Sequence, residues 1–158
     1  MNQRTLSLVM LSIAVAAVVG CSKPPTEDEL MQSAVQHQSE DEYDDALRDF
    51  RLLTEQYPKS DKVPEALLAM GVICQNKKKE YRRAESLYTQ LALNFPGNPV
   101  AQSAAYERAR ILMENLHQPD SARIAYQYFL QHYPDAMSAS SAKIELDSLN
   151  ASTRSSKR

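Results

Sequence analysis

The 158-residue sequence predicts an all-α fold, an array of three helical hairpins closed by one further helix. The main observation is a repeat with a period of 38 residues that runs through the chain without a slip. Small, aromatic and large apolar residues stand at i, i+4 and i+7 of each unit, which lines one face of an α-helix. Periods of about 20–50 residues are typical of stacked supersecondary units. The recurring columns are Ala46, Ala84 and Ala122; Phe50, Tyr88 and Tyr126; Leu53, Leu91 and Phe129; and Ala66, Ala104 and Ala142.

An aromatic residue followed by proline ends the second helix of each unit. The pairs Tyr57-Pro58, Phe95-Pro96 and Tyr133-Pro134 keep the same period. Proline pushes the residue before it out of the α region, so the helix is expected to end there. Another helix then follows, which carries the small residue of the last column. Each unit is therefore a hairpin that cannot bury its apolar face alone.

Capping signals and prolines set the predicted helix boundaries. Thr26 and Glu29 form a capping-box pattern before the first helix. Asn98 and Asp135 are predicted N-caps of the fifth and seventh helices. Prolines suit the first turns of the third, fifth and sixth helices, at Pro64, Pro99 and Pro119. The expected helices run over about 27–38, 41–57, 62–76, 79–95, 98–115, 119–133 and 136–149.

The chain begins with a pattern typical of a secretion signal. Arg4 precedes an almost wholly apolar stretch over residues 5–20. That stretch is shorter than the roughly 20 residues of a membrane-spanning helix, but it suits the apolar region of a signal peptide. We therefore predict a signal peptide over residues 1–20.

The end of the apolar stretch resembles the lipobox of bacterial lipoproteins. It reads Val18-Val19-Gly20-Cys21, with an apolar residue three positions before the cysteine and a small residue directly before it. The resemblance implies cleavage before Cys21 and acylation of its sulfur and new N-terminus. Ser22, rather than aspartate, follows, which in enteric-type bacteria implies sorting to the outer membrane. The protein is thus expected to be lipid-anchored on the periplasmic face of the outer membrane, with residues 21–25 as a short tether.

The repeat itself resembles a known family. Alanine, an aromatic residue four positions later, an apolar residue three further on and proline after another five resemble the second-helix signature of tetratricopeptide repeats. The preceding helices offer small residues at Ala34, Gly71 and Ala109, where such repeats place glycine or alanine. The run from Tyr57 to Gly71 is similar to the repeats of bacterial envelope proteins, such as the lipoprotein of the β-barrel assembly machine and the Tol-Pal coordinator. The resemblance covers about residues 26–149, and it implies a right-handed superhelix with a groove for partner proteins.

Composition and charge narrow the possible partners. The chain holds 18 Lys and Arg against 20 Asp and Glu, a net charge of −2, whereas a nucleic-acid-binding domain calls for a basic surface. With Cys21 acylated, Cys74 is the remaining thiol, so no intramolecular disulfide can form. Cys74 lies on the apolar face of its helix and is predicted to be buried. The small, polar and basic stretch 150–158 is predicted to be a disordered tail.

The sequence offers no pattern that predicts catalysis. His37, His117 and His132 lack metal-ligand spacing. The chain has three glycines and no glycine-rich phosphate loop. We therefore predict no catalytic residue, no metal, no cofactor and no small-molecule substrate, and expect that the protein is not an enzyme.

A partner-binding groove is expected along the first helices of the repeats, because the tetratricopeptide resemblance implies it. Met31, Leu68 and Tyr106 would form an apolar stripe there, although the same residues could instead simply belong to the core. Arg110 replaces the valine of the earlier repeats and could pair with a partner's carboxylate. The predicted groove residues are Met31, Val35, Leu68, Val72, Gln75, Asn76, Tyr106, Arg110, Met113 and Glu114.

These patterns together predict a lipid-anchored periplasmic scaffold that binds other envelope proteins and acts in outer-membrane protein assembly. A role similar to that of the Tol-Pal coordinator in envelope maintenance is one alternative. A structural lipoprotein that assembles with itself is another. A lipid-anchored hydrolase would need a catalytic constellation and a catalytic domain, and the sequence leaves few residues for either.

Overall fold

The computed structural model describes residues 23–156, so the predicted signal peptide and Cys21 lie outside the described residues. Over the described range the chain is helical, and none of its helices combines the length and apolar character needed to cross a membrane. The helices are α2 (Glu27–Ser39), α3 (Tyr43–Gln56), α4 (Val63–Val72), the π-helix η1 (Ile73–Lys78), α5 (Tyr81–Asn94), α6 (Pro99–Glu114), α7 (Pro119–His132) and α8 (Ala139–Ser156).

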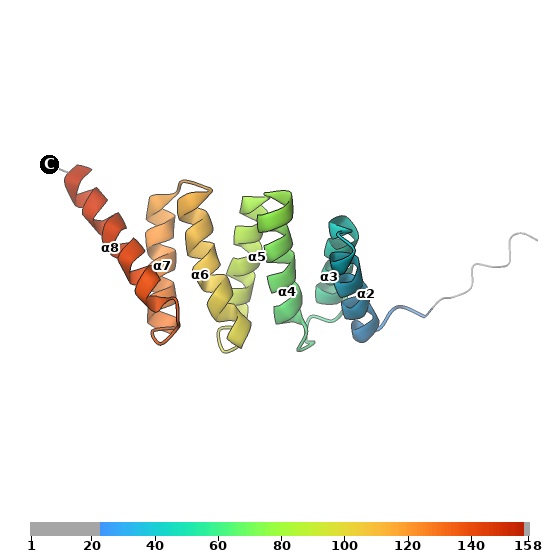
Figure 1. Cartoon of the computed structure of the whole chain (residues 1–158). Helices are drawn as coiled ribbons and strands as arrows, with labels where there is room; N and C mark the ends of the chain where they lie inside the picture. The colour runs from blue at the N-terminus through green and yellow to red at the C-terminus, as the bar shows by residue number, and fades with distance from the viewer. Residues whose placement is uncertain (1–22, 157–158) are drawn as a thin grey trace, which may run out of the picture.

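The helices form three hairpins in a row, followed by α8 at the C-terminal end (Figure 1). The hairpins are α2 with α3, α4 and η1 with α5, and α6 with α7. Each hairpin packs against the next along the array, and α4 also contacts α6. The predicted all-α array of three hairpins and a closing helix is therefore confirmed.

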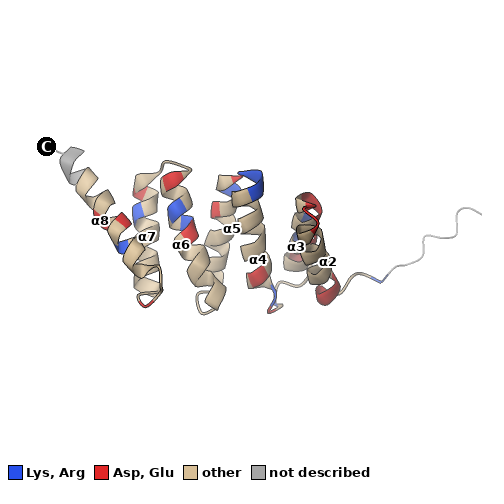
Figure 2. Cartoon of the chain, viewed as in Figure 1, with Lys and Arg blue, Asp and Glu red and all other residues tan. Residues whose placement is uncertain are grey.

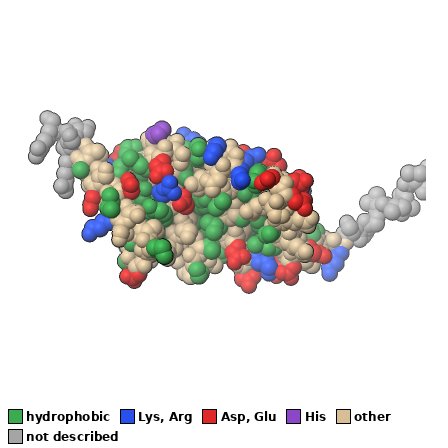
Figure 3. Space-filling model, in the orientation of Figure 1, with side chains coloured by type: hydrophobic (Ala, Val, Ile, Leu, Met, Phe, Trp, Pro, Cys, Tyr) green, Lys and Arg blue, Asp and Glu red, His purple; other side chains and the backbone are tan. Residues whose placement is uncertain are grey.

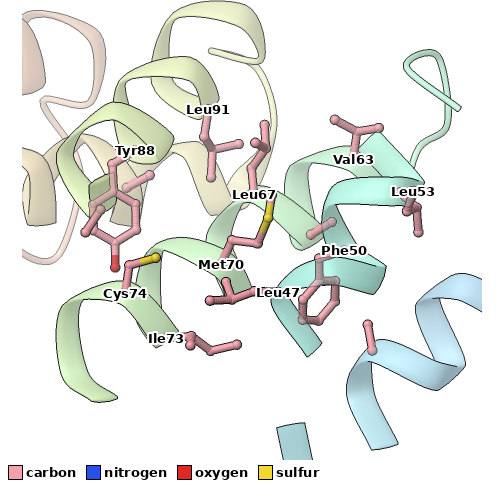
Figure 4. Packing of buried hydrophobic residues seen from close by; sticks show 14 of the residues in the cluster. Leu47, Phe50, Leu53, Val63, Leu67, Met70, Ile73, Cys74, Tyr88 and Leu91 are labelled. Carbon is pink, nitrogen blue, oxygen red and sulfur yellow. The ribbon is translucent and has the colours of Figure 1, made fainter. Parts of the chain in front are cut away.

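The predicted columns form the core. Every member of the four columns is buried, as are Ala34, Gly71 and Ala109 on the first helices. Figure 4 shows Phe50 of α3, Met70 of α4 and Leu91 of α5 among the side chains that fill the space between these helices. The small residues allow close approach: a Cβ atom added at Gly71 would lie 2.4 Å from Cε1 of the Tyr88 ring.

Cys74 is buried, as predicted. Burial raises the pKa of its thiol, and the negative charge of the nearby Glu80 acts in the same direction. A thiol that stays protonated and inaccessible is a poor nucleophile, so Cys74 contributes to packing.

Two of the predicted caps are confirmed. The backbone N–H of Glu29 donates to Thr26 Oγ1 at 3.2 Å, and the backbone N–H of Thr26 donates to Glu29 Oε2 at 2.7 Å. This second hydrogen bond is the main cause of the lowered pKa of the Glu29 carboxyl. Before α6, Asn98 Oδ1 accepts from the N–H of Val100 at 3.0 Å.

The predicted cap at Asp135 is wrong, because α8 begins only at Ala139. Two turns separate Tyr133 from the helix: the N–H of Ala136 donates to the Tyr133 carbonyl, and that of Ala139 to the Ala136 carbonyl. Ala139 stands two periods after Val63, the first residue of α4. The turn of the first repeat thus recurs here and delays the helix.

The predicted disordered tail is also wrong over residues 150–156, because α8 continues to Ser156. Leu149 is buried against the preceding hairpin and anchors this part of the helix. The Ser152 hydroxyl donates to the Leu149 carbonyl at 2.9 Å, and neither proline nor glycine follows to end the helix. Residues 157–158 lie outside the described range.

The turn inside each hairpin uses a residue in the left-handed conformation. Asp41, Lys79 and His117 have φ angles of 62°, 57° and 52°, and they recur at the same period of 38. At the first turn the N–H of Glu42 donates to the His37 carbonyl five positions back, which is the 6→1 bond of the Schellman motif. At the second and third turns the corresponding bond is one residue longer, from Glu80 to the Cys74 carbonyl and from Gln118 to the Leu112 carbonyl. Such a motif normally has glycine at the left-handed position. The absence of glycine there hid the motif in the sequence.

Candidate protein-binding surface

The predicted groove residues lie on the first helices of the three hairpins. They come from α2, from α4 and η1, and from α6, which share the near side of the array in Figure 1. Val35 and Val72 occupy equivalent places on α2 and α4 and are 50% and 37% exposed. Figure 2 shows acidic and basic residues on the helices in the same view, and Figure 3 shows apolar side chains between charged ones across this side of the molecule.

The apolar stripe of Met31, Leu68 and Tyr106 is partly buried and packs against the core. The Tyr106 ring contacts two rings of α7: its centroid lies 6.3 Å from that of Tyr126, edge to face, and 5.4 Å from that of Phe129. Met113 is likewise partly buried against the C-terminal core. The stripe therefore both stabilises the hairpins and offers part of its surface to solvent.

A chain of hydrogen bonds joins the second repeat to the third across this face. The buried Tyr88 hydroxyl donates to Gln75 Oε1 at 2.8 Å, and Gln75 Nε2 donates to Glu107 Oε2 at 3.0 Å. Burial, followed by the negative charge of Glu107, raises the pKa of the Tyr88 hydroxyl, so it remains a donor. Gln75 therefore contacts both the core and the surface of α6.

Arg110 extends this series of hydrogen bonds, because it contacts two glutamates on α6. Its guanidinium forms two hydrogen bonds with the Glu114 carboxylate, at 3.1 and 2.9 Å, and an ion pair with Glu107 at 3.2 Å. The bonds to Glu114 are the main cause of the raised pKa of Arg110. Glu107 is a functional candidate that we missed in the sequence, although its spacing to Arg110 of three residues is a known helix pairing. A partner carboxylate that bound Arg110 would compete with both glutamates.

The helix that carries Gln75 and the exposed Asn76 is not a regular α-helix. After Val72 the chain changes to the π-helix η1, which ends at the left-handed Lys79. The sequence predicts an ordinary helix over 62–76, because its apolar pattern shows no break there. Single π-turns often occur at functional sites, and here the wider turn supplies two of the predicted groove residues.

A Ser, Asp and His cluster between α2 and α3 has the residue types of a hydrolytic site but not the geometry. The Ser33 hydroxyl donates to Asp49 Oδ2 at 2.6 Å, and His37 Nδ1 lies 3.0 Å from the same oxygen. A nucleophilic serine would need its hydroxyl bonded to the imidazole. Here the nearly buried Asp49 carboxylate contacts both the serine hydroxyl and the imidazole, so the cluster stabilises the packing of α2 against α3. Within the described range, no three His, Cys, Asp or Glu side chains gather as a metal site.

The structure also contains a cleft that sequence reasoning missed. It has a volume of about 720 Å³ and lies between α3 and α5, above α4, away from the predicted groove; we call it the α3–α5 cleft. Its floor consists of the apolar side chains of Val63, Leu67 and Met70, which α4 contributes. The other residues that line it are Arg51, Thr54, Glu55, Pro58, Arg83, Leu87, Gln90, Asn94 and Phe95.

Comparison with known proteins does not place the chain in a family. No protein-family model and no curated protein matches it. Among solved structures, the chain is similar to a tetratricopeptide repeat protein from Parabacteroides merdae, with 14% sequence identity and a TM-score of 0.37. The alignment covers 80% of this chain, which spans only 60% of that protein. The fold assignment therefore rests on the helices and their packing.

Proposed function

We propose that this protein is a lipid-anchored scaffold of the bacterial envelope that binds partner proteins through the face formed by α2, α4 and α6. The observation that carries the proposal is the pair of exposed valines, Val35 and Val72, beside the partly exposed Met31, Leu68 and Tyr106. Apolar side chains that gather on one face beside charged groups are typical of protein-interaction surfaces. The two hydrogen-bonded glutamates around Arg110 add a polar end to this face.

The placement in the envelope is supported by the sequence. The lipobox at Cys21 and the serine that follows it favour anchoring in the outer membrane, facing the periplasm. Outer-membrane protein assembly is the role we favour, because the repeats resemble those of the assembly-machine lipoprotein. A role similar to the Tol-Pal coordinator, or self-assembly, would use the same surface with other partners. In each of these roles the protein acts by binding and not by catalysis.

Charge substitutions of the two exposed valines test the binding face. We expect Val35→Asp and Val72→Asp to reduce partner capture by about thirtyfold each, since central interface residues often contribute about 2 kcal/mol or more. Both side chains are solvent-accessible, so thermal unfolding should change little. Capture is measured by crosslinking and co-purification of the full chain from detergent-solubilised envelope.

Ile124→Asp is the matched control, because Ile124 is 64% exposed but belongs to α7, a second helix. Equal losses for Ile124 and for the two valines would show that general surface apolarity, not this face, drives capture. Arg110→Gln is a better probe of the polar end than a glutamate substitution, which would crowd three carboxylates on α6. The identity of the captured proteins separates barrel assembly, Tol-Pal and self-association.

Removal of the acyl acceptor tests the anchor. Cys21→Ser should give an unprocessed or soluble protein, because the sulfur that receives the lipid is absent. Fractionation of cells and the mass of the N-terminal peptide measure this directly. A variant that was processed normally and still sedimented with the outer membrane would contradict the lipoprotein assignment.

A further inference from the structure

The seam between the second and third repeats is joined by two tyrosine hydroxyls. Tyr128 of α7 donates to the Ala92 carbonyl at 2.9 Å, and Tyr133 donates to the Pro96 carbonyl at 3.1 Å. Proline has no N–H, and Pro96 stands four residues after Ala92, so the Ala92 carbonyl cannot receive its ordinary helical hydrogen bond. The Tyr128 hydroxyl supplies the missing donor.

The seam between the first and second repeats has the same acceptors but lacks both hydroxyls. One period earlier, Gln90 stands in place of Tyr128 and Phe95 in place of Tyr133. Pro58 likewise removes the helical donor of the Thr54 carbonyl. Within residues 23–156, no donor contacts the Thr54 or Pro58 carbonyl oxygen.

These residues lie at the α3–α5 cleft. Thr54, Pro58, Gln90 and Phe95 all line it. At the other end of the same seam, Lys78 of η1 pairs with Asp44 of α3 at 2.6 Å, and neither residue lines the cleft. The cleft is therefore the place where the repeat pattern omits its own aromatic donors.

The floor of the cleft differs from that of the other seam. The cleft has Val63, Leu67 and Met70 at its base. The equivalent residues one period later are Ala101, Ala105 and Arg108. The base of the cleft is therefore bulkier and more apolar than the equivalent part of the neighbouring seam. Its lining also includes Thr54 and Pro58, the residues of the two carbonyl acceptors.

The charged residues at the rim of the cleft favour a negatively charged ligand. Arg51 and Arg83 stand on opposite walls of the cleft, against the single acid Glu55. Arg83 pairs with Glu80 at 3.0 Å, whereas among the described side chains no carboxylate lies within 4.0 Å of the Arg51 guanidinium. An acidic group beside a bound ring would reach Arg51.

We propose that the α3–α5 cleft binds a tyrosine side chain that a partner protein presents beside an acidic residue. The ring lies on Val63, Leu67 and Met70, and the hydroxyl donates to the Thr54 or Pro58 carbonyl, as Tyr128 and Tyr133 do in the neighbouring seam. This surface belongs to the second helices α3 and α5 and is separate from the face of α2, α4 and α6. Binding at the cleft would leave that face available for another segment of the same partner or for another protein.

The test uses two blocked peptides, Gly-Asp-Tyr-Asp-Gly and its phenylalanine analogue, added to the full chain in detergent. Binding is followed by NMR of the methyl groups of Leu67 and Met70. We expect saturable shifts of these methyls and an affinity about fivefold weaker for the phenylalanine peptide, since a neutral hydrogen bond contributes about 1 kcal/mol. Arg51→Gln should weaken the tyrosine peptide by about twofold to fivefold.

A substitution that fills the cleft gives a second test. Gln90→Tyr should fill the cleft and abolish the shifts, whereas Ser86→Tyr adds the same ring to an exposed position of α5 outside the cleft and should leave them intact. Shifts confined to other methyls, equal affinities for the two peptides, or binding that survives Gln90→Tyr would each overturn the proposal. The peptide comparison on the unaltered protein decides the question even if the plug variant fails to fold.

Discussion

Replacing Gly71 by valine is expected to destabilise the array by about 3 kcal/mol, at the upper end of the cost of overpacking a core. The first added carbon would overlap the Tyr88 ring at 2.4 Å, and the two methyl groups would extend the overlap. The ring cannot move aside easily, because it is fully buried and its hydroxyl is bonded to Gln75. Alanine at the same position should cost less, since it gains about 1 kcal/mol of helix propensity over glycine.

Gly97→Val provides the control, because a Cβ atom at Gly97 has no neighbour within 4 Å. Urea or thermal unfolding followed by circular dichroism measures both variants, and for Gly71 we expect a fall in melting temperature of roughly 10 °C. Combining Gly71→Val with Tyr88→Leu should recover part of the loss. If the two glycine variants melted together, close packing of α4 against Tyr88 would be ruled out.

Phe129→Ala is expected to cost about 3–5 kcal/mol, as for other buried aromatic residues truncated to alanine. Phe129 is fully buried in α7, and its ring lies 5.4 Å from the Tyr106 ring and 5.8 Å from the Tyr133 ring. Its loss leaves a cavity beneath the stripe of the proposed binding face. Tyr106 would then lose a supporting ring, so partner capture should also weaken.

Two variants bracket this effect. Phe129→Leu restores the residue type found at Leu53 and Leu91 in the same column, and it should recover most of the stability. Gln131→Ala, at an exposed position of α7, should change the free energy of unfolding by no more than about 0.5 kcal/mol. Unfolding that was as mild for Phe129→Ala as for Gln131→Ala would show that the column does not hold the third repeat.

The repeat made most of the fold predictable from sequence. A column such as Ala46, Ala84 and Ala122 combines helix periodicity with a fixed repeat length, and both follow from the same packing of helix on helix. The end of the last helix was harder to predict. Composition near Ser156 is typical of disorder, but burial of Leu149 against the preceding hairpin extends the helix.

The surface was less predictable than the core, because surface contacts depend on where helices place side chains in space. From the sequence we predicted that Arg110 could pair with a partner's carboxylate, whereas the structure pairs it with Glu107 and Glu114 of its own helix. The α3–α5 cleft arises from residues that break the repeat pattern, Gln90 and Phe95. A search for recurring residues passes over such positions, and comparing the columns for missing hydroxyls would have found them.

The hydrogen-bonded chain from Tyr88 through Gln75 to Glu107 has a thermodynamic consequence for regulation. It links the interior of the second hairpin to the charged end of α6, where Arg110 is held. A partner that draws Arg110 away from Glu107 would alter how firmly the second and third hairpins are held together. Linkage is reciprocal, so any event that loosens or tightens this junction would change the partner's affinity by the same factor. If a partner binds this face as proposed, occupancy of the face and stability of the junction between the second and third hairpins would therefore be coupled.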